Sequence, residues 1–147
     1  MLGVAVAVLG LAGCDLGTFG GPAAIQLQGG NLTIVVCRDV TVVAANLTAM
    51  TSEGPERVWE ATGRETLQRG DFIAPSNPPS GLSTVTLGRT ELVPGEAVSL
   101  VLLAPERPGV NGDIYADFKI PSDGVPSNKW IQSNGEITNG SCDGWPE

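Results

Sequence analysis

The chain has 147 residues, which is enough for one domain with a proper core and too few for two ordinary domains. Its formal net charge of −8 repels phosphate backbones and argues against nucleic-acid binding. A hydrophobic fraction of 41% against 16% charged residues argues against disorder, and the 20 glycines and 11 prolines favour strands and turns over helices.

The first segment of the chain is apolar and ends at a cysteine. Residues 2–12 carry no charge, are typical of the apolar core of a signal peptide, and are too few for a membrane-spanning helix, which needs about 20 apolar residues. Leu11, Ala12, Gly13 and Cys14 resemble the lipobox of bacterial lipoproteins. The resemblance implies that a signal peptidase recognises residues 11–13 and removes residues 1–13. It also implies that Cys14 receives a diacylglycerol and becomes the first residue of the mature protein.

The start of the chain departs from the lipoprotein pattern, because no Lys or Arg precedes the apolar run. Either the true start lies upstream of Met1, or the α-amino group alone supplies the positive charge. The alternative interpretation is that residues 2–12 form a buried strand or short helix, with Cys14 as a core cysteine.

Residues 14–30 are predicted to be the lipidated cysteine and a flexible tether, because residues 15–30 carry five glycines and a proline without sustained periodicity. Two or more acyl chains would hold such a protein stably on a membrane. The folded domain is therefore expected at residues 31–147.

The two remaining cysteines, Cys37 and Cys142, are predicted to form a disulfide in a chain that folds outside the reducing cytosol. The bridge would close a loop of about 105 residues and contribute about 4–5 kcal/mol in the chain-entropy model. The alternative is two separate buried thiols. A zinc site is disfavoured, since two cysteines without any histidine cannot complete its usual ligand set.

Alternating or β-branched residues predict strands at 32–38, 40–50, 57–63, 65–73, 82–88, 96–104, 113–120 and 128–138. Asp39 is expected to mark a bulge or bend, and the three prolines of residues 74–81 predict a loop. Pro94 and Gly95 fit a type II turn, and Asn134 and Gly135 fit a type I′ hairpin. Residues 113–120 alternate most clearly, with Ile114, Ala116, Phe118 and Ile120 expected to face inward.

This strand pattern predicts an all-β domain, a single immunoglobulin-like β-sandwich of about seven to nine antiparallel strands. The immunoglobulin sequence signature is not met, because Trp59 lies 22 residues after Cys37 and no tyrosine corner precedes Cys142. With one cysteine in an early strand and another in a short tail, the chain is similar to small secreted lipoproteins of high-GC Gram-positive bacteria. That resemblance implies no activity.

The sequence excludes most familiar catalytic chemistry. Without histidine, Ser-His-Asp and Cys-His catalysis are impossible, and no nucleotide-binding glycine motif occurs. Along their strands, Glu56 and Glu60, like Asp113 and Asp117, would lie about 13 Å apart, too far for a glycosidase pair. We therefore expect no catalytic residue, no enzyme activity and no cofactor.

Two weaker binding patterns remain. Carboxylates could offer oxygen ligands to calcium, but no calcium-binding loop is present, so solvated surface groups are the simpler interpretation for Asp113, Asp117, Asp123 and Asp143. No metal site is therefore expected. Trp59 is expected in the core and Trp130 over a sheet edge. Trp145 and Trp130 are candidate ligand contacts, and the alternative for Trp145 is packing over the disulfide.

Together these features predict an extracytoplasmic protein anchored by lipid to the outer face of the bacterial cell membrane. Its expected role is a non-enzymatic interaction or accessory module of the cell envelope, a monomer with an envelope protein as partner. The alternative is a module that binds a carbohydrate or another small ligand. A tryptophan in a concave groove would favour the ligand, and a flat polar surface would favour a protein partner.

Overall fold

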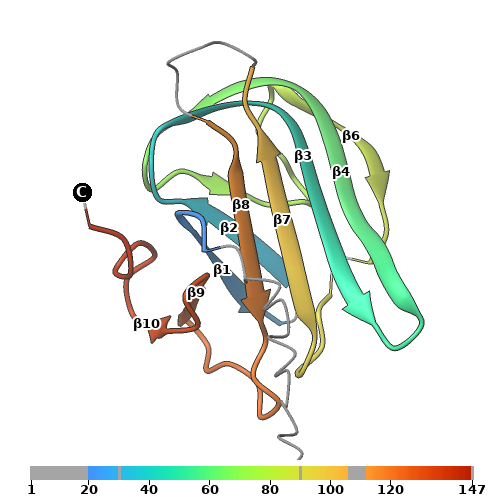
Figure 1. Cartoon of the computed structure of the whole chain (residues 1–147), viewed down its shortest axis with the longest axis vertical. Helices are drawn as coiled ribbons and strands as arrows, with labels where there is room; N and C mark the ends of the chain where they lie inside the picture. The colour runs from blue at the N-terminus through green and yellow to red at the C-terminus, as the bar shows by residue number, and fades with distance from the viewer. Residues whose placement is uncertain (1–19, 30, 90, 106–111, 147) are drawn as a thin grey trace, which may run out of the picture.

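Two antiparallel five-stranded sheets make up the domain and pack face to face (Figure 1). The computed structural model describes residues 20–29, 31–89, 91–105 and 112–146. The predictions for Leu11 to Cys14 lie outside these residues. The strands are β1 (Ala23–Gln28), β2 (Asn31–Val36), β3 (Val40–Thr51), β4 (Gly54–Leu67), β5 (Phe72–Ile73), β6 (Leu82–Leu87), β7 (Ala97–Leu103), β8 (Ile114–Lys119), β9 (Trp130–Gln132) and β10 (Ile137–Thr138). The prediction of an all-β sandwich is confirmed.

The first sheet has the strand order β10-β9-β1-β2-β5, and the second has the order β6-β4-β3-β7-β8. The first sheet joins strands from both ends of the chain, since β1 pairs with β2 on one side and with β9 on the other. The chain passes from one sheet to the other at residues 37–39, so Asp39 lies at the predicted bend. The order β4-β3-β7-β8 matches strands C′, C, F and G of an immunoglobulin variable-type sheet.

The predicted tether is wrong for residues 23–28, which form β1 in the middle of the first sheet. Ala23, Ala24 and Ile25 have no exposed surface. Gln28 pairs with Asn31, so that residues 29 and 30 alone connect β1 to β2, and Gly29 has a φ of 57°. Glycine suits the positive φ that such short hairpins require. Gly29, predicted to belong to a tether, is therefore a hairpin residue.

The core between the sheets contains the side chains that the alternation of residues 113–120 predicted to face inward. Ile114, Ala116, Phe118 and Ile120 are all buried, whereas Tyr115 is 42% exposed. Trp59 is completely buried, as predicted, and its Nε1 donates to Thr84 Oγ1 at 3.3 Å. One aromatic side chain thus supplies much of the apolar surface beneath β4.

Strand β4 is longer than expected: it includes the strand predicted at 57–63 and the start of the one predicted at 65–73, whose end forms β5. Gly63 has a φ of 147° inside this strand, and a Cβ there would lie 2.0 Å from the carbonyl oxygen of Gly81. Glycine therefore lets β4 continue where a side chain would collide with the loop before β6. Residues 74–81 form the predicted loop, apart from an isolated bridge between Ala74 and Asn77.

The two predicted turns differ in outcome. Glu96 N donates to Val93 O at 3.3 Å and Gly95 has a φ of 89°, which confirms a type II turn. The hairpin between β9 and β10 is present, but its type I′ turn is wrong. A type I′ turn needs a positive φ at both central residues, and Asn134 lacks it. Gly135, at a φ of 91°, instead ends a three-residue loop.

Candidate functional site: the disulfide-anchored C-terminal tail

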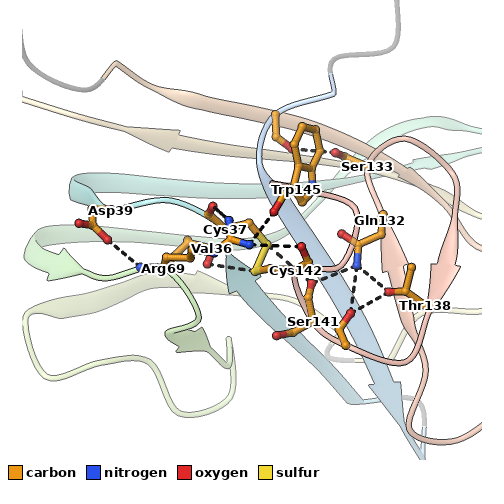
Figure 2. Close-up of a disulfide and its surroundings, with 12 residues drawn as sticks. Val36, Cys37, Asp39, Arg69, Gln132, Ser133, Thr138, Ser141, Cys142 and Trp145 are labelled. Carbon is orange, nitrogen blue, oxygen red and sulfur yellow. Dashed lines mark hydrogen bonds between the residues drawn. A yellow bond between two sulfur atoms is a disulfide. The ribbon is translucent and has the colours of Figure 1, made fainter. Parts of the chain in front are cut away.

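A disulfide between Cys37 and Cys142 holds the C-terminal tail, residues 139–146, against the first sheet (Figure 2). Cys37 directly follows β2, and the Cα atoms of the two cysteines lie 5.4 Å apart. Cys37 is 2% exposed. The predicted pairing is confirmed, and it fixes the last residues of the chain to the point where β2 leaves its sheet.

Arg69 binds the same tail from the loop between β4 and β5. Its guanidinium donates to the carbonyl oxygens of Cys37 at 2.8 Å, Cys142 at 3.4 Å and Trp145 at 2.5 Å (Figure 2). Its backbone N–H donates to Asp39 Oδ1 at 2.9 Å, which orients the loop. The planar fork of an arginine suits several carbonyl acceptors at once. Arg69 therefore connects both halves of the disulfide loop and the end of the tail.

Gln132 holds the tail from its other side. Its side chain is completely buried on β9, and Nε2 donates to Thr138 Oγ1 at 2.8 Å and to Ser141 O at 3.0 Å. Gln132 Oε1 and Trp145 Nε1 are buried without a hydrogen-bond partner among the described residues. Sequence patterns singled out neither Arg69 nor Gln132, because an isolated polar residue near a strand end gives no sign of which carbonyls it will meet.

The two candidate ligand-contact tryptophans pack around the disulfide. Trp130 on β9 is 8% exposed and joins Ala24, Val35 and Cys37 in a small cluster on the outer side of the first sheet. Trp145, which is half-buried, packs against this cluster. Their ligand role stays a prediction. Phe72, which is 57% exposed, stacks on the Trp130 ring at a centroid distance of 5.7 Å.

A pocket of about 330 Å³ lies elsewhere, along the ends of β7 and β8. Met50, Ala97 and Phe118 supply apolar walls, and Ser99 Oγ donates to Asp117 Oδ1 at 2.5 Å. This serine and aspartate are paired across the two strands. A hydroxyl bound to a carboxylate, without histidine, lacks the strong base that activates a nucleophilic serine.

The described residues contain no cluster of three or more His, Cys, Asp or Glu side chains placed to hold a metal ion. Two of the aspartates considered for calcium bind backbone N–H groups: Asp113 Oδ1 accepts from Ala104 N, and Asp143 Oδ2 accepts from Gly140 N, both at 2.8 Å. Within the same described ranges, no helix is long and apolar enough to cross a membrane.

Comparison with known proteins finds no matching family model, no matching curated protein and no matching solved structure.

Proposed function

We propose that this protein is a lipid-anchored, extracytoplasmic β-sandwich that serves the bacterial cell envelope as a non-enzymatic interaction or accessory module. The observation that carries the proposal is the bridge between Cys37 and Cys142. Structural disulfides form and persist in oxidising compartments, outside the cytosol. With these two cysteines paired, Cys14 in its lipobox-like context is the one cysteine left for acylation.

The position of the first described residue supports a short attachment. Gly20 bridges to Ala116 on β8, and the N–H of Gly21 donates to Tyr115 O at 2.8 Å. Five residues lie between Cys14 and Gly20, and the six steps along the chain span at most about 22 Å when fully extended. Acylation at Cys14 would thus keep the β8 side of the sandwich close to the membrane surface.

The decisive experiment is acylation of the full chain in a bacterial host fed an alkyne-labelled fatty acid. The parent protein should carry the label and sediment with membranes. Cys14→Ser should lose the label and enter the soluble fraction, and Ser141→Ala, a small change in the tail, should behave as the parent does. An unlabelled parent whose N-terminal peptide still contains residues 1–13 would refute the proposal.

Recognition of a carbohydrate is a second candidate, favoured by one observation. The Phe72 ring is more than half exposed and is backed by Trp130, as in platforms that stack against sugar rings. A glycan that binds there should change Trp130 fluorescence, and Phe72→Ala should abolish the change. A fluorescence change that survives this substitution would place the glycan elsewhere.

A further inference from the structure

The four outer strands of the two sheets differ in how well their edges are protected. Unpaired edges can bind further strands, so proteins shorten, cover or charge them. Strands β5 and β10 have two residues each, and Gly20 and Gly21 cover part of β8. Strand β6 has six residues and, within the part of the chain that the structure describes, pairs only with β4 (Figure 1).

The sequence of β6, Leu-Ser-Thr-Val-Thr-Leu, contains neither a charged residue nor a proline. Five of its six residues are exposed, with Val85 at 60% and Leu87 at 46%. By contrast, β8 carries Asp117 and Lys119 along its length. Strand β6 therefore has the length and composition of an edge that accepts another strand.

A β-bulge sets which faces the β6 side chains occupy. Thr84 pairs with Ala61 and Thr86 with Glu60, so Val85 is an extra residue opposite β4. Because of this extra residue, Leu82 and Leu87 lie on the same side of the sheet although five positions separate them. Leu82 is buried in the core, and Leu87 pairs with the buried Trp59. The bulge twists this edge, but it also aligns both leucines with the core face.

The sequence of β6 reads nearly the same in both directions. When two copies of β6 run antiparallel about a point between Thr84 and Val85, Leu82 lies opposite Leu87 of the second copy. Ser83 then lies opposite Thr86 of the second copy, with both hydroxyls on the outer face. A two-fold axis perpendicular to the sheet keeps both core faces on the same side, as a symmetric interface requires. We propose that a second copy of this chain pairs with β6 and extends the second sheet into a continuous ten-stranded sheet.

Charge supports this occupant. Two chains of net charge −8 repel each other, so they can meet only where like charges are absent or balanced. Beside the uncharged β6, Arg57 pairs with Glu60 at 3.0 Å, and Arg89 contacts both Glu56 and Glu96. These five charges sum to −1, so this edge is close to neutral on a protein of net charge −8.

The expected contact is weak in dilute solution. Two six-residue strands bury less than the roughly 1,000 Å² that a stable interface needs. Attachment of both copies to one membrane raises their effective concentration. The strength of the dimer therefore rests on the proposed function, because it needs the membrane anchor. The geometry of the strand pairing does not depend on that anchor. The pairing also replaces the expected monomer by a dimer that forms on the membrane.

Engineered cysteines test the register directly. In the full chain with Ser83→Cys and Thr86→Cys together, each new thiol would lie opposite its counterpart in the second copy, within the reach of a disulfide. The two thiols of one chain are three residues apart, about 10 Å, and cannot bridge each other. Mild oxidation of membrane vesicles that contain this variant should give a covalent dimer. The single variants, Ser83→Cys and Thr86→Cys, should give at least tenfold less.

A charged residue supplies the second test. Val85→Lys in the double-cysteine chain should reduce the crosslinked dimer at least tenfold, since it places two like charges at the centre of the pair. Val93→Lys is the matched control, because Val93 is 52% exposed but lies outside every strand, and it should leave the crosslink unchanged.

The outcomes separate the dimer from the membrane anchor. No dimer in the double variant, equal dimer in the single variants, or a crosslink to a different protein would each overturn the pairing. The Cys14→Ser chain, concentrated in solution, repeats the assay without an anchor. A register-specific crosslink there, together with an unlabelled parent, would retain the pairing and reject the lipid attachment.

Discussion

Removal of the disulfide is the sharpest test of how this domain is stabilised. In the double variant Cys37→Ala with Cys142→Ala, a cross-link across a sequence separation of 105 is lost. A loop of that length costs the unfolded chain about 4.7 kcal/mol of conformational free energy in the chain-entropy model. The free energy of unfolding should fall by about that amount. With an m-value of about 1–3 kcal/mol/M, the midpoint of urea unfolding falls by about 1.5–5 M.

The assay is urea unfolding followed by circular dichroism and by tryptophan fluorescence. Arg69 still binds the carbonyl oxygen of Trp145 in the double variant, so the tail should stay docked in the native state and the native fluorescence should change little. A third chain that also ends at residue 138 removes the contacts of the tail itself. The difference between the two variants then measures those contacts separately from the cross-link.

A loss below about 1 kcal/mol in the double variant would refute the reasoning, since the unfolded chain would then gain little freedom from the broken bridge. A large loss of unfolding free energy together with an undocked tail would also refute the chain-entropy reasoning. The bridge would then act through the native contacts rather than through the unfolded state.

The remaining predictions concern single side chains. Arg69→Ala should lower the free energy of unfolding by about 1.5–3 kcal/mol in thermal unfolding, because the carbonyl oxygens of Cys37 and Trp145 lose a charged donor. The side-chain hydrogen bond from Arg89 lowers the pKa of Glu96 below its ordinary value of 4.5. The ionised Glu96 carboxylate therefore stabilises the folded state above pH 4.5, and this stabilisation is lost as the pH falls through the lowered pKa of the folded state. Glu96→Gln should thus destabilise the protein at neutral pH but not in acid. Gly63→Ala should cost about 2 kcal/mol or more in urea unfolding, because its Cβ would meet the Gly81 carbonyl.

Matched variants isolate each cause. Arg57→Ala removes an exposed pair with Glu60 and should cost less than about 1 kcal/mol, so an equal loss with Arg69→Ala would contradict the role of Arg69 in holding the tail. Gly54 has a φ of 114°, and a Cβ built there has no atom within 4 Å. Gly54→Ala is therefore the control for Gly63→Ala, since it measures backbone strain without a collision. If the free energy of unfolding of the parent and of Glu96→Gln fell by the same amount between neutral and acidic pH, the pH argument would be contradicted.

Local patterns in the sequence were sufficient for the sandwich and for the disulfide. Residues 113–120 alternate on an edge where only one face is buried, so the period of two is directly visible. The cysteine pairing was predicted from the number of cysteines and from the expected location outside the cytosol alone. The Pro94 and Gly95 turn followed because type II geometry demands a positive φ at its third residue.

The errors arose where tertiary contacts override local signals. Strand β1 was missed because two glutamines interrupt its apolar residues and glycines flank it, although Gln26 is almost completely buried. Its partner β9 lies over 100 positions away, and no local pattern reveals that pairing. The same limit applies to Arg69, whose acceptors on the tail lie 73 and 76 positions away.

The pairing of β1 with β9 has a consequence for the proposed export of the chain. Ile25 meets Ile131 in the first sheet, so this sheet stays incomplete until residue 131 has been synthesised. Long-range pairing of this kind slows folding. Under the proposed extracytoplasmic location, a nascent chain whose first sheet closes only after β9 is made would remain threadable through a narrow export channel and would become compact after the passage.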